Sequence, residues 1–152
     1  MMRRSALPVA LVAAALLPAA VRAQAADGRK VYGTTCAACH QPTGQGAAGT
    51  YPPLAGSEIA TGDEAKLIRV VLHGLTGEVE VQGETFNGAM PAWGPTLKDD
   101  DIAAVLTYVR SAWGNKASPV TAASVAQIRA ATAARKTPWT AQELAQVIPV
   151  KK

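Results

Sequence analysis

This sequence is poor in the side chains that build most metal and redox centres. Its 152 residues include only two cysteines, two histidines and, besides Met1 and Met2, a single methionine. A structural zinc site needs four ligands, and only His40 and His73 are available to join the two cysteines. Low-complexity repeats are also absent. Any cofactor chemistry must therefore use a very small set of residues.

The sequence has only one long apolar run, and that run lies near the N-terminus. Residues 1–23 have two early arginines, Arg3 and Arg4, then the apolar run Ala6–Ala20, and end in Val21-Arg22-Ala23, a small-x-small pattern. This order is typical of a secretory signal peptide, so we expect cleavage after Ala23 or nearby and a periplasmic location. An uncleaved membrane anchor is the alternative, although the run is short for a bilayer span and is interrupted by two prolines.

A strong excess of one charge is missing once this leader is set aside. The full chain has 15 Lys and Arg against 11 Asp and Glu, and without the three arginines of residues 1–23 the balance is 12 against 11. A nucleic-acid partner is therefore not expected. The charge is uneven, because residues 116–152 hold six Lys or Arg and only Glu143. We expect one compact domain over residues 24–115, followed by a basic helical extension over residues 116–152 that either packs on this domain or binds a partner.

The two cysteines form a motif with the histidine that follows them. Cys36-Ala37-Ala38-Cys39-His40 has the spacing C-x-x-C-H, the attachment signature of c-type haem. In such a motif two thiols one helical turn apart add to the vinyl groups, and the histidine binds the iron. We expect one haem c, bound covalently by Cys36 and Cys39 and ligated by His40. The alternatives are a disulfide, a thioredoxin-like pair or half of a zinc site.

An electron-carrying haem iron needs a sixth ligand, for which methionine or histidine is usual. Met90 is the sole thioether outside residues 1–23, and it lies among turn-forming residues in the uncharged segment Thr85–Leu97. A methionine in such a loop is poorly placed to fill a core, so we expect Met90 to bind the iron. His73 is the competing candidate, but near the end of a helix it can instead interact with the last carbonyl groups.

Start and stop signals predict a mostly helical chain. The helices expected from N-caps and apolar periodicity are Gly28–Ala38, a helix from Asp63-Glu64 to His73-Gly74, Asp99–Trp113, Thr121–Arg135 and Thr140–Val147. Most of the uncharged stretch Val31–Ser57 is expected to be a loop because it contains several glycines and prolines. The segment Glu78–Gly88 is typical of a small hairpin or an extended loop.

Together these features resemble the class I c-type cytochromes over Gly28 to Asn115. The shared motifs are Gly28, Tyr32 and Cys36 at four-residue intervals, Pro52-x-Leu54, Met90-Pro91 and a final helix with Tyr108. The resemblance implies an all-α cytochrome c fold, in which three to four core helices surround the haem.

The same resemblance implies roles for several side chains around the haem. Gly28 would let the first and last helices cross closely, with Tyr32 and Tyr108 packed at the contact. The Pro52 carbonyl would accept a hydrogen bond from the axial histidine, and Leu54 would pack beside the ring. One departure is Lys98, which stands where a Ser or Thr often caps the final helix.

The resemblance also implies a function. The segments Tyr51–Ser57, Val71–Leu75 and Asn87–Pro91 are similar to small proteobacterial cytochromes that accompany periplasmic dehydrogenases or copper nitrite reductases, and to domains of multihaem alcohol dehydrogenase subunits. We therefore expect a one-electron carrier, not an enzyme, between a periplasmic or membrane-bound oxidoreductase and the respiratory chain, with a dehydrogenase, reductase or oxidase as partner.

Other functions remain open at this point. One alternative is an electron-transfer subunit of a dehydrogenase complex. A haem peroxidase or a gas-binding haem protein is another, because an iron without a sixth ligand from the protein is open to gases and peroxide. We expect a monomer or a subunit of a complex, and peripheral membrane association is compatible with either.

Overall fold

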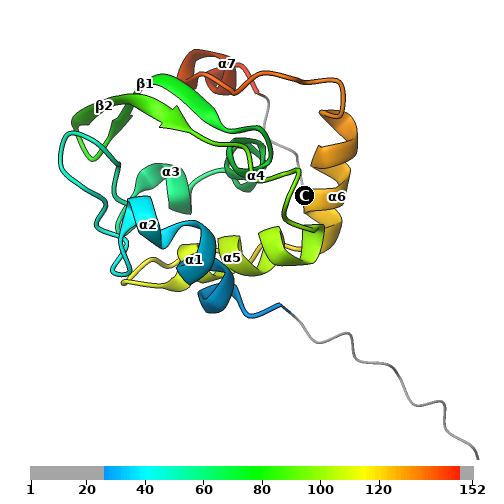
Figure 1. Cartoon of the computed structure of the whole chain (residues 1–152), viewed down its shortest axis with the longest axis horizontal. Helices are drawn as coiled ribbons and strands as arrows, with labels where there is room; N and C mark the ends of the chain where they lie inside the picture. The colour runs from blue at the N-terminus through cyan, green and yellow to red at the C-terminus, as the bar shows by residue number, and fades with distance from the viewer. Residues whose placement is uncertain (1–25, 148–152) are drawn as a thin grey trace, which may run out of the picture.

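The computed structural model describes residues 26–147. In these residues it has seven helices and one two-stranded sheet (Figure 1). In chain order the elements are α1 (Gly28–Thr35), α2 (Ala37–His40), α3 (Glu58–Thr61), α4 (Glu64–His73), β1 (Leu75–Val81), β2 (Glu84–Met90), α5 (Asp99–Ser111), α6 (Ala122–Ala131) and α7 (Ala141–Ala145). The predicted signal peptide, residues 1–23, lies outside the described residues. Within residues 26–147, none of the helices has the length and apolar character needed to cross a membrane.

Helices α1 and α5 cross at close range, and the crossing depends on Gly28. A β-carbon at this position would collide with the carbonyl oxygen of Ala104. Beside the contact, the rings of Tyr32, Tyr108 and Trp113 pack together with centroids 5.0, 5.4 and 5.5 Å apart. Tilted aromatic pairs of this kind are favourable beyond the area that they bury. The packing roles expected for Gly28, Tyr32 and Tyr108 are confirmed, and Trp113 joins them.

The inner faces of α4 and α5 supply much of the hydrophobic core. Asp63 begins α4 by accepting hydrogen bonds from two backbone N–H groups of the first turn, and Gly74 ends it, as the sequence predicts. One face of α5 forms a buried apolar stripe, with the side chains of Ile102, Val105, Leu106 and Val109 at most 3% exposed. Lys98 gives α5 no side-chain cap, and its N–H donates instead to Asp101.

A β-hairpin lies on the side of the molecule opposite α1 and α5 (Figure 1). Strands β1 and β2 pair antiparallel, with Leu75 opposite Met90 at the open end. The turn residues Gln82 and Gly83 both have positive φ, 53° and 77°, which is the backbone of a type I′ turn. The helical part of the predicted fold is confirmed, but the sheet means that the fold is not purely α-helical. The hairpin expected at Glu78–Gly88 is present and extends further at both ends.

Met90 occupies the last position of β2, whereas the sequence predicts a loop there. Gly88, one of the residues that suggested a loop, lies opposite Gly77 in the ladder. The ladder continues past this pair to Met90, which lies opposite Leu75. The prediction of a loop at Met90 is therefore wrong, and the backbone of Met90 is instead held by pairing with β1.

The C-terminal extension packs on the domain that precedes it. Val125 and Ile128 of α6 belong to the same buried cluster as side chains of α4 and α5. Further along, the backbone of Trp139 pairs with β1. Its carbonyl oxygen accepts from the N–H of Thr76 at 2.8 Å, and its own N–H donates to Gly74 at 3.0 Å. The structure therefore agrees with the expectation that the extension packs on the preceding domain. The domain boundary at residue 116 stays a prediction.

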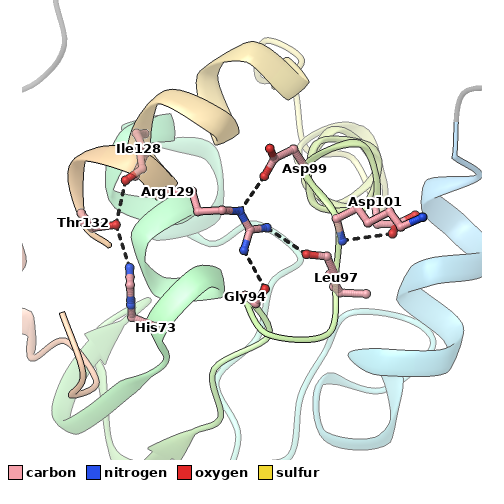
Figure 2. Close-up of polar contacts among 9 residues, drawn as sticks. His73, Gly94, Leu97, Asp99, Asp101, Ile128, Arg129 and Thr132 are labelled. Atoms are coloured by element: carbon pink, nitrogen blue, oxygen red, sulfur yellow. Dashed lines mark hydrogen bonds and ion pairs between the residues drawn. The ribbon is translucent and has the colours of Figure 1, made fainter. Parts of the chain in front are cut away.

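His73, at the end of α4, takes part in this contact. Its Nε2 lies 2.7 Å from the hydroxyl oxygen of Thr132, and that hydroxyl donates to the carbonyl of Ile128 (Figure 2). Because the single hydroxyl proton is used on Ile128, Nε2 of His73 is the donor. The pKa of His73 is lowered by burial and then by the positive charges of Arg135, Arg129, Lys136 and Arg69.

The crossing of α1 and α5 can be tested with two glycines of the same helix. We expect Gly28→Ala to lower the free energy of unfolding by about 2 kcal/mol, because the new methyl group must displace the backbone of α5. Gly33→Ala is the matched control. A β-carbon at Gly33 would meet nothing within 4 Å, and alanine is preferred over glycine in a helix by about 0.5–1 kcal/mol. Urea unfolding measures both variants, and equal destabilisation would contradict the close crossing.

The contact of His73 with the extension predicts a pH dependence. In the unfolded chain His73 takes up a proton near its ordinary pKa of 6.5, whereas the folded protein resists protonation. The free energy of unfolding should therefore fall as the pH drops below about 6.5 and stop falling, for this group, at the lowered folded-state pKa. His73→Gln removes this component. Urea titrations at several pH values should show that the stability gap between the two proteins changes over this window, and a constant gap would refute the argument.

Candidate functional site

Two adjoining cavities lie under the hairpin, between α4, α5 and the loop that follows α2. Their volumes, including the space open to solvent, are about 760 and 950 Å³. Both are bordered by His40, Pro52, Leu75, Val79 and Met90, so they are parts of one larger space. Within the described part of the chain, no Asp, Glu, Lys or Arg lines either cavity. The two uncharged sequence stretches thus meet around an apolar space.

Cys36 and Cys39 both border this space. Cys36 lies between α1 and α2 and lines the first cavity, and Cys39 lies within α2 and lines the second. Both thiols are free in the structure, which does not support the disulfide alternative. Burial raises the pKa of the Cys36 thiol, while its contact with the Thr35 hydroxyl at 3.3 Å acts in the opposite direction. The Cys36 thiol is therefore protonated at neutral pH.

His40 ends α2 and is only 9% exposed. Its Nδ1 lies 2.9 Å from the carbonyl oxygen of Pro52. Since a carbonyl oxygen only accepts, Nδ1 carries the proton and Nε2 keeps a free lone pair. Burial lowers the pKa of His40, and the hydrogen bond to Pro52 opposes this shift. His40 is thus a neutral imidazole with one nitrogen able to bind a metal ion.

The loop after His40 is fixed at both of its ends. The carbonyl of Gly44 accepts from the N–H of Leu54 at 2.7 Å, and the Leu54 side chain lines the first cavity. Asn115, 6% exposed, donates to the carbonyls of Leu54 at 3.0 Å and Val109 at 2.7 Å, and accepts from the N–H of Gly56 at 2.8 Å. This one side chain therefore joins the loop to the C-terminal end of α5.

Sequence reasoning missed the role of Asn115. The helix expected over Asp99–Trp113 ends just before Gly114 and Asn115, and asparagine is common at such an end without any further role. The bond to Gly56 joins residues 59 positions apart, and no periodicity or local spacing indicates a partner at such a distance. The one signal in the sequence that could have indicated this role was the polar side chain of Asn115 just beyond a helix with an apolar face.

Met90 borders both cavities from the hairpin, as His40 does from α2. A residue with an imidazole and a residue with a thioether thus border one shared space. His73 lines neither cavity and is bonded to Thr132 instead. Among residues 26–147, no group of three or more His, Cys, Asp or Glu side chains is placed to hold a metal ion by itself. One imidazole, one thioether and two thiols around an apolar space fit a haem c rather than a zinc ion.

Comparisons with known proteins agree with this geometry. The family model described as cytochrome c matches residues 25–113. Cytochrome c-552 from Thermus thermophilus is 46% identical over 114 residues, which cover 69% of this chain and 86% of that protein. A cytochrome c-552 from a further strain of Thermus thermophilus is 45% identical over 129 residues, 79% of this chain and 85% of that protein.

A third relative is much longer than this chain. The cytochrome c subunit of the quinone alcohol dehydrogenase from Gluconacetobacter polyoxogenes is 37% identical over 105 residues, which cover 67% of this chain but 22% of that subunit. The family model spans more than half of the chain, and the two Thermus proteins are matched over most of their length. The chain therefore belongs to the cytochrome c family, and like its members it carries covalently bound haem c and acts as an electron carrier.

Proposed function

We propose that this chain holds a single haem c between His40 and Met90 and carries one electron at a time in the periplasm. The observation that supports the proposal best is that these two side chains, from α2 and from β2, border the same uncharged space. In the proposal Cys36 and Cys39 form the covalent links to the haem vinyl groups, and His40 and Met90 are the axial ligands.

The residues around the proposed ligands fix their orientation. The hydrogen bond from Nδ1 of His40 to Pro52 holds the ring plane and leaves Nε2 for the iron, and such outer contacts also raise the basicity of the ligand. Leu54 lies in the wall of the first cavity and packs beside the ring in this proposal. The strand pairing with Leu75 holds the backbone of Met90 on the side of the hairpin.

The haem supplies an iron that changes by one electron. The chain contributes the surroundings of that iron. The side chains that line the first cavity are mostly apolar, so they exclude most water and favour the less charged, reduced state. A thioether ligand acts in the same direction, because methionine with histidine raises the reduction potential. Ligands held in place by the fold, in a cavity that excludes water, would keep the coordination of the iron the same in both oxidation states. An electron carrier requires such a small structural change.

The proposed partners are redox proteins. One relative is the cytochrome c subunit of a quinone alcohol dehydrogenase, and this chain covers only a part of that subunit. By analogy we propose that this chain accepts electrons from a periplasmic or membrane-bound oxidoreductase and delivers them toward the respiratory chain. A place as the electron-transfer subunit of a dehydrogenase complex is the second candidate, which the same similarity favours.

An enzymatic role is less well supported. A haem peroxidase needs an open iron position, whereas Met90 borders the cavity from a paired strand. Neither cavity has a charged acid or base in its described walls. We therefore propose that the chain is an electron carrier without a reaction of its own.

The ligand assignment is tested by Met90→Ala in the haem-loaded protein. The variant should lose the near-infrared charge-transfer band of the oxidised protein and fall in reduction potential, because the thioether that favours reduced iron is gone. Its ferrous form should bind carbon monoxide, and the wild type should not. His73→Ala is the control and should keep the band. Retention of the band by Met90→Ala, or its loss in His73→Ala, would overturn the assignment.

The proposed location is tested by producing the full chain in a bacterium that attaches haem outside its cytoplasm. Cell fractionation should place the haem protein in the periplasm, and N-terminal sequencing should begin at Gln24 or within a few residues of it. A chain without residues 1–23 should stay in the cytoplasm and lack haem. Recovery in the membrane with Met1 still present would favour the anchor instead.

A further inference from the structure

The backbone that follows Met90 leaves the sheet and is held by other elements. The hairpin ladder ends at the pair of Leu75 and Met90. Three residues later, the N–H of Trp93 donates to the carbonyl of Val71 at 2.9 Å, and the N–H of Gly94 donates to the carbonyl of Leu72 at 3.1 Å. One side of this segment, residues 91–98, is thus attached to the last turn of α4.

Arg129 of α6 also binds this segment, through its guanidinium group (Figure 2). Its Nη1 donates to the carbonyl of Gly94 at 2.6 Å and its Nη2 to the carbonyl of Leu97 at 2.8 Å. Its Nε donates to a carboxylate oxygen of Asp99 at 2.7 Å. All three nitrogens of the guanidinium are engaged, and the planar fork fixes its acceptors relative to one another.

Gly94 is the point where the two attachments meet. Its N–H is bonded to α4 and its carbonyl to Arg129. A β-carbon at this position would lie 2.6 Å from the carbonyl oxygen of Leu72, so the backbone fits closely between the two helices. The side chains of Arg129 and Asp99 are only 34% and 33% exposed. Charge-assisted hydrogen bonds in such partly shielded places are stronger than neutral ones.

We propose that Arg129 is a positioning residue for the sixth iron ligand. By fixing residues 91–98, it prevents the backbone of Met90 from moving away from the haem, and so keeps the thioether on the iron. This inference rests on Met90 being the ligand, as proposed above. No residue of α6 borders either cavity within the described chain, so Arg129 acts through the backbone and not by touching the haem. In this way the C-terminal extension supports the position of the sixth iron ligand.

The test is a titration of the oxidised, haem-loaded protein with imidazole, followed through loss of the thioether charge-transfer band. Imidazole binds iron only when the thioether is off, so its apparent affinity scales with the fraction of protein in that open state. Arg129→Ala should raise the apparent affinity about tenfold. Arg129→Lys keeps the charge but not the fork, and should give an intermediate rise. Met90→Ala sets the upper limit.

Arg135→Ala is the matched control. Arg135 is a cation of the same extension, but its hydrogen bonds go to Thr137, Pro138 and Glu143, all within the extension, and it lies 3.7 Å from the ring centroid of Trp139. Its loss should loosen the extension without freeing residues 91–98, and the imidazole affinity should stay within about twofold of wild type, well below the tenfold rise that opening of the site produces. Far-UV circular dichroism checks that the helices of every variant are intact.

The outcomes separate the two proposals. If Met90→Ala abolishes the band but Arg129→Ala binds imidazole no more tightly than Arg135→Ala, Met90 is the ligand and the positioning role is wrong. If wild type and Met90→Ala bind imidazole equally, the ligand assignment itself fails and the positioning role with it. If Arg129→Ala does not fold, Arg129→Lys decides: an affinity equal to that of wild type overturns the proposal, and a rise above the Arg135→Ala value supports it.

Discussion

The hydrogen bond from Nδ1 of His40 to the carbonyl of Pro52 connects the parts of the structure that form the site. It attaches the helix that carries the cysteine motif to the loop behind it. Asn115 joins that loop to the C-terminal end of α5. Helix α5 in turn crosses the helix that leads into the motif, and the two meet at Gly28. These contacts connect the motif, the loop, α5 and α1 in a closed ring of structural contacts. A histidine held by such contacts keeps one tautomer and one ring orientation, which a metal ligand requires.

A prosthetic group in the space under the hairpin would complete the interior of this small and loop-rich domain. The chain has only 5% aromatic residues and a single phenylalanine, yet α4, α5 and the hairpin all turn apolar side chains toward the same space. A porphyrin placed there completes the hydrophobic core, and burial of its faces stabilises the fold by the same effect that buries side chains. Folding and cofactor attachment are thus expected to support each other. The C-terminal extension adds to the same interior, because α6 packs on the core cluster and the backbone of Trp139 pairs with β1.

Local signals in the sequence were enough to predict much of this arrangement. Asp63 and Gly74 mark the two ends of α4, the apolar stripe of α5 identifies its buried face, and C-x-x-C-H places the proposed haem attachment. These features depend on residues within a few positions of one another. The bonds of Arg129 to Gly94 and of Asn115 to Gly56 join residues 35 and 59 positions apart, and nothing local in the sequence reports them. The strand at Met90 could not be predicted from local signals either, because it is formed through its pairing with β1.

The central claim is that this polypeptide carries one haem, attached through Cys36 and Cys39 and enclosed between His40 and Met90. The most direct measurement is the intact mass of the exported protein after denaturation, which removes any group that is not covalently bound. The account predicts the mass of the processed chain plus one haem, with the haem lost from a variant in which both cysteines are serine. A mass equal to the polypeptide alone, or to the polypeptide with a disulfide between the two cysteines, would contradict it.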